Sequence, residues 1–326
     1  MSEQTMAEAL RDGLRELLAA DERVIVLGED VEAGGVFRIT EGLLDEFGER
    51  RIFDTPLAES GFTGAAIGAA LGGMRPIVEI QFVDFILPAV NQLISEAAKM
   101  RWRSRGEWQV PLVVRTPWGG GVHGGLYHSQ SFEALFAHVP GLKVVAPATP
   151  ADAKALLHAA VADPDPVIFL EHKRTYRLIR GEVPDPLPAV GIGEAALQRD
   201  GGDVTLISYG LMLHECLAAA ETLAAEGIEC HVLDLRTIAP LDQAALLDAA
   251  RHTGKVVIVH EDHLSGGVGG EVAALIAEHA FDHLDGPITR VAGPDVPAMG
   301  YHAKLEAAFM PDAARIAEAV RGLAAY

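Results

Sequence analysis

Few cysteines, no long apolar run and no basic excess limit what this chain can be. Its 326 residues include two cysteines, Cys216 and Cys230, and no CxxC pair, so neither a zinc ribbon nor a thioredoxin-type site is expected. Isolated cysteines are usually buried, and we interpret both as ordinary thiols of a reducing compartment. No apolar stretch approaches the roughly 20 residues that a membrane helix needs.

The chain also lacks a basic surface by composition, because 46 acidic residues outnumber 26 basic ones and give a formal net charge of −20. Binding to a phosphate backbone requires a basic face, so we expect no nucleic-acid partner. The first residues do not resemble a signal peptide. Thr5 to Glu8 has the pattern of a capping box before an amphipathic run, so we expect a cytoplasmic protein without a membrane segment.

Several common catalytic motifs are absent. There is no GxSxG. Residues 254–255 do not complete a P-loop, and residues 267–272 do not complete a dinucleotide fingerprint. The histidines in residues 260–263 are one residue too close for HExxH, so they would not share a helix face. We interpret the glycines of residues 265–270 as structural, allowing a helix to pack closely on a sheet.

What the sequence does contain is an alternation of short β-branched runs with Ala/Leu-rich runs, which predicts βαβ units and mainly parallel sheets. Residues 180–193 hold three prolines and predict an extended connector. We expect an α/β protein with two domains, residues 1–185 and 195–326, joined by a linker at 186–194. Strands are expected at 24–27, 76–82, 112–114, 142–146, 167–170, 204–208, 229–233, 255–259 and 288–291, and helices at 58–71, 85–103, 131–138, 151–162, 215–225, 242–251, 270–279 and 312–323.

An acidic residue begins a helix that has almost no side-chain bulk. Glu59 precedes a run in which Gly and Ala fill most positions from 61 to 70. Such a helix lets another backbone, a subunit or a cofactor approach closely. From these residues alone, Glu59 either stabilises the positive helix end or lies in a tightly packed, water-poor site.

Seven segments, in order along the chain, resemble one family. The likeness covers essentially the whole sequence and is to the beta subunits of the E1 components of the pyruvate, branched-chain 2-oxo acid and acetoin dehydrogenases, of the transketolase-like superfamily. The segments are GEDV (28–31), GGVFRITEGL (34–43), DTPLAESG (54–61), EIQFVDF (79–85), GGLYHSQS (124–131), HVPGLKVVAPATPADAK (138–154) and DLRTIAPLD (234–242).

The resemblance implies thiamine-diphosphate-dependent oxidative decarboxylation of a 2-oxo acid and transfer of the acyl group to the lipoyl group of an E2 acyltransferase. It gives Glu59 the role of the family's glutamate, which hydrogen-bonds the pyrimidine of the cofactor. It places Leu57, Gln81 and Phe85 in the aminopyrimidine pocket, with Phe85 stacking on the ring. Judged without the family, Phe85 would be a core aromatic residue.

The resemblance also implies a catalytic histidine and an ion site. His128, in GGLYHSQS, matches the family histidine that faces the active-site channel and either helps acyl transfer or stabilises the intermediate. Glu29 is interpreted either as part of an acidic path between active sites or as a solvated strand end. Relatives hold potassium at the turn that matches residues 163–166, and the alternative is an Asp-Pro turn without an ion. The residues that would bind it are Leu112, Ala160, Val161, Asp163 and Asp165.

The diphosphate-binding motif of thiamine enzymes is missing. Such enzymes hold Mg²⁺ with a GDG motif and a later asparagine, whereas this chain has no GDG and only one asparagine, Asn91. The resemblance therefore implies that an E1 alpha subunit holds Mg²⁺ and the diphosphate, and that thiamine diphosphate is shared within an α2β2 heterotetramer.

Alternatives remain at this point. They are an acetoin dehydrogenase E1 beta subunit, a fragment of a transketolase-like or deoxyxylulose-phosphate-synthase-like enzyme, and a non-catalytic scaffold subunit. For the substrate we favour branched-chain 2-oxo acids over pyruvate, with acetoin third, because residues 127–134 resemble branched-chain members although Phe85 resembles pyruvate members. Residues 294–310 depart from the family pattern.

Overall fold

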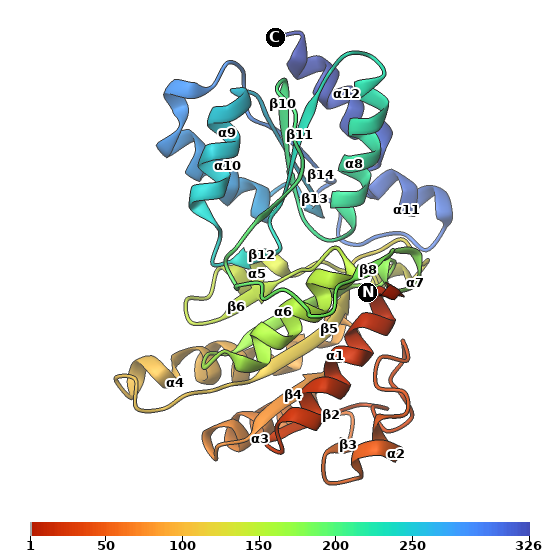
Figure 1. Ribbon diagram of the computed structural model, residues 1–326, viewed down its shortest axis with the longest axis vertical. Helices are drawn as coiled ribbons and strands as arrows, with labels where there is room; N and C mark the ends of the chain where they lie inside the picture. The colour runs from red at the N-terminus through yellow and green to blue at the C-terminus, as the bar shows by residue number, and fades with distance from the viewer. Residues whose placement is uncertain (1) are drawn as a thin grey trace. The chain divides into compact units, whose positions relative to one another are not determined.

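The computed structural model describes residues 2–326, and its contacts divide the chain into two units (Figure 1). The first unit contains the residues up to Trp118 and Leu135–Ile192, and the second contains Gly119–Ala134 and Gly193–Tyr326. The structure thus assigns residues 119–134 to the second unit, whereas the sequence places them in the first domain. In the part of the chain that is described, no helix combines the length and hydrophobicity needed to cross a membrane.

The first unit is built on a parallel sheet in which the strands follow the order β6-β7-β5-β4-β2-β3. The central strands are buried along their length, as expected where helices cover both faces. Its strands are β2 (Val24–Gly28), β3 (Ile52–Asp54), β4 (Arg75–Glu79), β5 (Val113–Trp118), β6 (Lys143–Val145) and β7 (Val167–His172), with an antiparallel pair β1 (Ser2–Thr5) and β8 (Arg180–Val183).

Helices α1 and α6 pack side by side and share one hydrophobic core with alternate residues of the sheet, such as Val24, Val26 and Ile77. Helix α3 packs against β4 and the short helices that follow it. The helices are α1 (Met6–Ala20), α2 (Leu43–Phe47), α3 (Glu59–Leu71), α4 (Ala98–Arg103), α5 (Glu133–Ala137), α6 (Pro150–Ala162), α7 (Thr175–Leu178), the 3-10 helices η1 (Val83–Phe85) and η2 (Leu87–Ala89), and the π-helix η3 (Gln92–Ala97).

Of two local predictions, the capping box before α1 is confirmed and the long helix at residues 85–103 is not. The capping box is confirmed, since the Glu8 amide donates to Thr5 Oγ1 at 3.2 Å and the Thr5 amide donates to Glu8 Oε2 at 2.7 Å. The single helix expected at residues 85–103 is wrong, because the chain forms η2, η3 and α4 in succession. Pro88 in the first turn of η2 cannot donate a backbone hydrogen bond, and the following turn widens into a π-helix.

The second unit has a sheet of order β14-β13-β10-β11-β9, parallel except for β9. Helices α9 and α10 cover one face and α8 and α12 the other (Figure 1). The elements are β9 (Ala196–Arg199), β10 (Val204–Ser208), β11 (Cys230–Asp234), β12 (Thr237–Ala239), β13 (Val256–His263), β14 (Thr289–Gly293), α8 (Leu211–Ala224), α9 (Gln243–Thr253), α10 (Val268–His279), α11 (Ala303–Phe309), α12 (Ala313–Ala324), and the 3-10 helices η4 (Gly125–Tyr127) and η5 (Phe281–His283).

The glycines before and within α10 have the structural role expected from the sequence. A Cβ atom at Gly269 would lie 2.6 Å from Nε2 of the buried His260, and one at Gly267 would lie 2.4 Å from the His263 carbonyl oxygen. These glycines let the helix start directly against β13. Cys216 and Cys230 are free and buried, as expected.

Candidate active site

Loops that follow three neighbouring parallel strands bring the expected pyrimidine-site residues to one edge of the first unit's sheet. Glu29 follows β2, and Glu59 begins α3 after β3. Gln81 and Phe85 come after β4. Because these strands are adjacent and parallel, their carboxyl ends lie at the same edge, where α/β sheets bind ligands. Gln81 Nε2 donates to Asp30 Oδ2 at 2.8 Å and links two of the loops.

Two carboxyl groups share this edge. Glu59 is half-buried in the first turn of α3, while Glu29 is only 4% exposed and its Oε1 atom has no hydrogen-bond partner within the described residues. Burial, followed by the negative charges of Glu59 and Asp30, raises the pKa of Glu29 to about 7. The interpretation of Glu29 as a solvated strand end is therefore wrong, and this edge can hold a proton near neutral pH.

An apolar surface accompanies the two carboxyl groups. Phe85 is half-buried and meets Phe82 edge to face, with ring centroids 5.7 Å apart, and Phe82 meets Phe37 in the same way at 5.6 Å. Leu57 lies on the loop before α3 and is 79% exposed. The residues expected to line an aminopyrimidine pocket thus combine an acid, an amide, an aromatic ring and an uncovered aliphatic side chain.

A buried charged cluster beneath this edge is not anticipated by the sequence analysis. Arg115 on β5 donates to Glu171 on β7 through Nε at 2.6 Å and Nη2 at 2.8 Å, and to Glu79 on β4 through Nη1 at 2.8 Å. The Tyr176 hydroxyl donates to Glu171 at 2.6 Å. Burial raises the pKa of Glu79, and Arg115 opposes that rise. The cluster joins three neighbouring strands, β4, β5 and β7, and stabilises the edge that carries the site.

The expected catalytic histidine belongs to the second unit. His128 is half-buried and follows η4, and the Gly119 amide donates to the Gln130 carbonyl oxygen at 3.0 Å across the base of its loop. A Cβ atom at Gly124 would lie 2.6 Å from the His128 carbonyl oxygen and 2.9 Å from its Cβ, so only glycine fits there without displacing the histidine. The sequence motif GGLYHSQS therefore includes a glycine that His128 itself requires.

Three buried acids of the second unit hold this loop. Glu306 Oε1 accepts from the amides of Gly121 and His123, both at 2.9 Å, and its Oε2 lies 2.7 Å from His123 Nδ1. Glu261 accepts from the Gly120 amide. At the end of the loop, the Tyr209 hydroxyl donates to Glu133 Oε1 at 2.8 Å, and burial, followed by the charge of Asp262, raises the pKa of Glu133. Glu306 lies in the region that departs from the family pattern.

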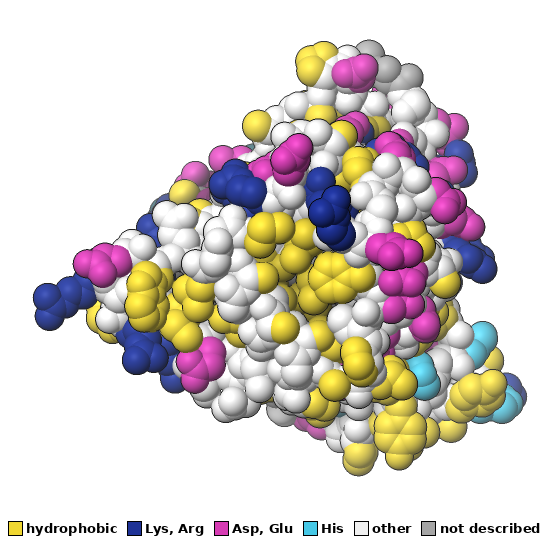
Figure 2. All heavy atoms as spheres, turned by 90° about the horizontal axis from the view of Figure 1, so that it is seen from below, with side chains coloured by type: hydrophobic (Ala, Val, Ile, Leu, Met, Phe, Trp, Pro, Cys, Tyr) yellow, Lys and Arg dark blue, Asp and Glu magenta, His cyan; other side chains and the backbone are white. Residues whose placement is uncertain are grey.

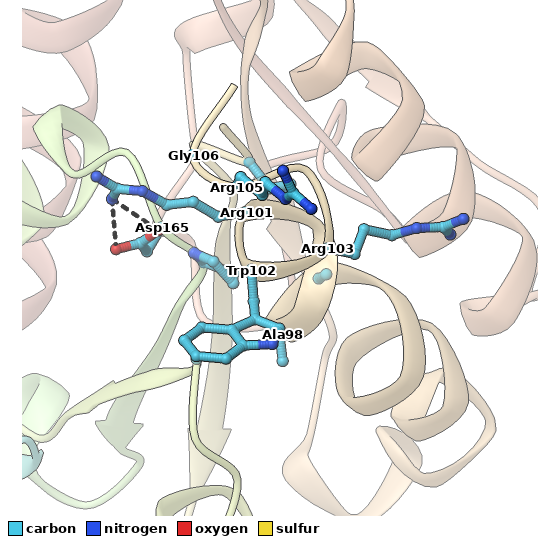
Figure 3. A pocket seen from close by; sticks show the side chains of 11 residues that line it. Ala98, Arg101, Trp102, Arg103, Arg105, Gly106 and Asp165 are labelled. Atoms are coloured by element: carbon cyan, nitrogen blue, oxygen red, sulfur yellow. Dashed lines mark hydrogen bonds and ion pairs between the residues drawn. The ribbon is translucent and has the colours of Figure 1, made fainter. Parts of the chain in front are cut away.

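The five expected potassium ligands already have hydrogen-bond or ion-pair partners. Lys143 Nζ binds both carboxylate oxygens of Asp163, at 2.6 and 2.7 Å. Arg101 binds both oxygens of Asp165 at the edge of a cavity of about 750 Å³ lined by Arg101, Trp102, Arg103 and Arg105 (Figure 3). The three carbonyl oxygens also accept hydrogen bonds. That of Leu112 accepts from the Val167 amide, that of Ala160 from the Asp163 amide, and that of Val161 from the Arg75 guanidinium group. Both carboxylates are thus paired with basic side chains in this arrangement, and potassium binding at the turn stays a prediction.

The first unit also exposes large hydrophobic side chains. Figure 2 shows such side chains gathered on the face seen from below, the side on which α3 lies in Figure 1. Extensive exposed apolar area is typical of a surface that another chain covers. The exposed large hydrophobic residues of this unit include Val36, Leu57, Leu71, Leu87, Trp102 and Trp108.

Known families and structures match both units. Residues 2–179 match the transketolase pyrimidine-binding domain, and residues 193–316 match the transketolase C-terminal domain. A solved split-gene transketolase, described as an inactive beta4 tetramer, has a TM-score of 0.81 at 25% identity, with 99% of each chain covered.

The sequence is also similar to curated proteins along its whole length. It is 56% identical to the 2-oxoisovalerate dehydrogenase subunit beta of Bacillus subtilis, with 100% of both chains covered. It is 47% identical to the pyruvate dehydrogenase E1 component subunit beta of the same organism, over 90% of this chain and 91% of the relative. With its two transketolase-like domains, the chain belongs to the family of E1 beta subunits of 2-oxo acid dehydrogenase complexes.

Proposed function

We propose that this chain is the beta subunit of an E1 component that decarboxylates branched-chain 2-oxo acids with thiamine diphosphate and passes the acyl group to the lipoyl group of E2. The observation that carries the proposal is the position of Glu59, which begins α3 at the carboxyl edge of the sheet beside the buried carboxyl group of Glu29. The higher identity to the 2-oxoisovalerate enzyme than to the pyruvate enzyme favours the branched-chain substrate class.

The residues at this edge fit one half of a thiamine diphosphate site. Phe85 and Leu57 offer apolar contact to a flat ring, and Gln81 offers amide hydrogen bonds. Thiamine diphosphate, when bound, supplies the carbanion that attacks the 2-oxo group and stabilises the charge left by loss of carbon dioxide. Within residues 2–326, the only group of His, Cys, Asp or Glu side chains able to hold a metal is Asp200, His231 and His252 in the second unit.

We therefore assign Mg²⁺ and the diphosphate to an E1 alpha subunit, so that the cofactor is shared between two chains, and we expect the α2β2 assembly that the family resemblance implies. The exposed hydrophobic residues of the first unit provide a surface for that partner. The reaction takes place in the cytoplasm, where free thiols such as Cys216 and Cys230 stay reduced.

Glu59 acts on a proton rather than on the substrate. With thiamine diphosphate bound, its carboxyl group would hydrogen-bond a pyrimidine nitrogen of the cofactor and hold a proton there. Glu29 limits how readily this edge carries two negative charges, since each carboxylate disfavours ionisation of the other. His128 would serve acyl transfer by donating a proton to the sulfur that leaves as a thiolate when the lipoyl disulfide bond is broken.

Glu59→Gln tests the assignment. The chain is co-expressed with its alpha subunit and assayed with a panel of 2-oxo acids, NAD⁺, E2 and E3 at saturating thiamine diphosphate. We expect the variant to lose at least about 100-fold in kcat, the usual contribution of a positioned acid-base group. Glu22→Gln, an exposed carboxylate, is the control. Full activity of Glu59→Gln would exclude the proposed role.

The same assay separates the remaining alternatives. A preference for branched-chain 2-oxo acids supports the substrate class, whereas a preference for pyruvate or acetoin reassigns it. A chain that binds its partners but is equally active without Glu59 and His128 would be a scaffold. Potassium at the Asp163 turn requires Lys143 and Arg101 to release the carboxylates, so activity that is equal in K⁺ and Na⁺ buffers would exclude it.

A further inference from the structure

Three potential metal ligands from separate elements meet on the second unit. Asp200 follows β9, His231 lies on β11, and His252 is in the last turn of α9. The antiparallel register pairs Arg199 with Val232 and so brings Asp200 beside His231. Asp200 Oδ1 lies 3.2 Å from His231 Nδ1 and 3.7 Å from His252 Nε2.

Buried hydrogen bonds and strand pairing fix the elements that carry the two histidines. The Thr205 hydroxyl on β10 donates to the Ala249 carbonyl oxygen at 2.8 Å and lies 2.9 Å from the Thr253 hydroxyl, which ties the last turn of α9 to the sheet. His231 is 8% exposed on a strand that pairs on both sides, and its ring centroid is 4.7 Å from that of His252. Ligands on rigid elements are already close to a binding geometry.

The spacing suits a small transition metal ion. Zinc binds histidine nitrogen and carboxylate oxygen at about 2.0–2.2 Å, so tetrahedral ligand atoms lie roughly 3.3 Å apart. The three ligand atoms here all lie within 4.8 Å of one another, and two of the distances are 3.2 and 3.7 Å. Two imidazoles and one carboxylate suit zinc and its neighbours in the first transition row, whereas calcium and magnesium prefer oxygen ligands.

We propose that Asp200, His231 and His252 bind a divalent transition metal ion of the zinc class, with water in the remaining position. Asp200 is exposed, with 79% of its side chain accessible, so an ion can enter from solvent. The ion would join the β9–β10 turn, β11 and α9. This site is independent of the proposed reaction.

The experiment uses the tag-free α2β2 protein, freed of transition metals by dialysis against a chelator and kept in saturating Mg²⁺. Co²⁺ is then added as the probe, because its visible spectrum reports tetrahedral nitrogen and oxygen ligands, and Zn²⁺ binding is measured by calorimetry. We expect one Co²⁺ per beta chain with a visible absorption band, and displacement of Co²⁺ by Zn²⁺.

Asp200→Asn and His252→Gln are the test variants. The Asp200 side chain is 79% exposed and that of His252 is 48% exposed, so neither substitution disturbs the core. Each should weaken Zn²⁺ binding by at least about tenfold. His279→Gln is the matched control, because His279 is also in the last turn of a helix, lies beside an acid and is 47% exposed, against 48% for His252. Binding that is absent from the wild-type protein, or unchanged in His252→Gln, would overturn the proposal.

Discussion

The buried carboxyl group of Glu29 gives the site edge a measurable dependence on pH. Its pKa is raised to about 7 from 4.5, first by burial and then by Glu59 and Asp30. The folded state therefore binds this proton more tightly than the unfolded state. The resulting stabilisation is complete below about pH 4.5 and is lost as the pH rises through 7.

We expect Glu29→Gln to remove this dependence. Relative to the variant, the wild-type chain should lose on the order of 2 kcal/mol of unfolding free energy between pH 5 and pH 8. Urea unfolding at several pH values measures the difference, with Glu22→Gln as the exposed control. Parallel pH curves for the wild type and Glu29→Gln would show that Glu29 ionises normally.

Residues that meet only through the fold explain what the sequence could not predict. Arg115 lies within an apolar strand, and nothing in the neighbouring sequence indicates that it forms hydrogen bonds with the carboxylates of Glu79 and Glu171. The metal cluster has the same origin, because a hydrogen bond between His231 and Asp200 spans 31 positions. His128, in contrast, was predicted through a family motif, and so was the role of Glu59, although the run of small residues after Glu59 was a local signal.

At the scale of elements, α11 acts on the histidine loop through Glu306. Two amide donors and one imidazole converge on its buried carboxylate. A hydrogen bond to a charged group contributes about 1.5–3 kcal/mol, so Glu306→Ala should loosen the loop while the sheet stays folded.

We expect the amides of Gly121 and His123 to exchange with deuterium about tenfold faster in Glu306→Ala. Transfer to the lipoyl group should slow more than decarboxylation measured with an artificial electron acceptor, because the loop carries His128. Lys304→Ala, exposed on the same helix, is the control. Equal losses in both activities would assign Glu306 a purely structural role.

The elements themselves followed the sequence where local signals were strong. The strand at β2 and the helices α3, α6 and α9 lie within one or two residues of their expected bounds. Strand β2 is a buried β-branched run, α6 and α9 begin at a capping side chain, and α3 is a run of mostly small residues. Short elements such as β3, β9 and α7 were not predicted, since three or four residues are too few to show the hydrophobic periodicity of a strand or a helix. The prediction of one helix at 85–103 was wrong, although the segment is helical in three shorter pieces. Its apolar residues predicted a helix, but Pro88 and packing against α3 divide that helix.

At the scale of the whole molecule, the chain should be inactive alone. Leu57 and other apolar side chains of the first unit are exposed to solvent. Apart from Asp200, His231 and His252, the described residues contain no group of His, Cys, Asp or Glu side chains that could hold the Mg²⁺ of a diphosphate. We expect no tight Mg²⁺-dependent binding of thiamine diphosphate to the isolated chain in calorimetry, and binding once the alpha subunit is added. Micromolar binding by the isolated chain would contradict the shared site.

The long connections of the fold also set an order of events during synthesis. Strand β1 pairs with β8, from Ser2 with Val183 to Thr5 with Arg180, so the first unit cannot close until the connector has left the ribosome. The loop that carries His128 can form its hydrogen bonds only later, because the Gly121 amide and its acceptor Glu306 are 185 residues apart. At about 5–20 residues per second, that separation corresponds to roughly 10–40 s of translation. His128 therefore becomes fixed last, after the sheet that carries Glu59 is complete.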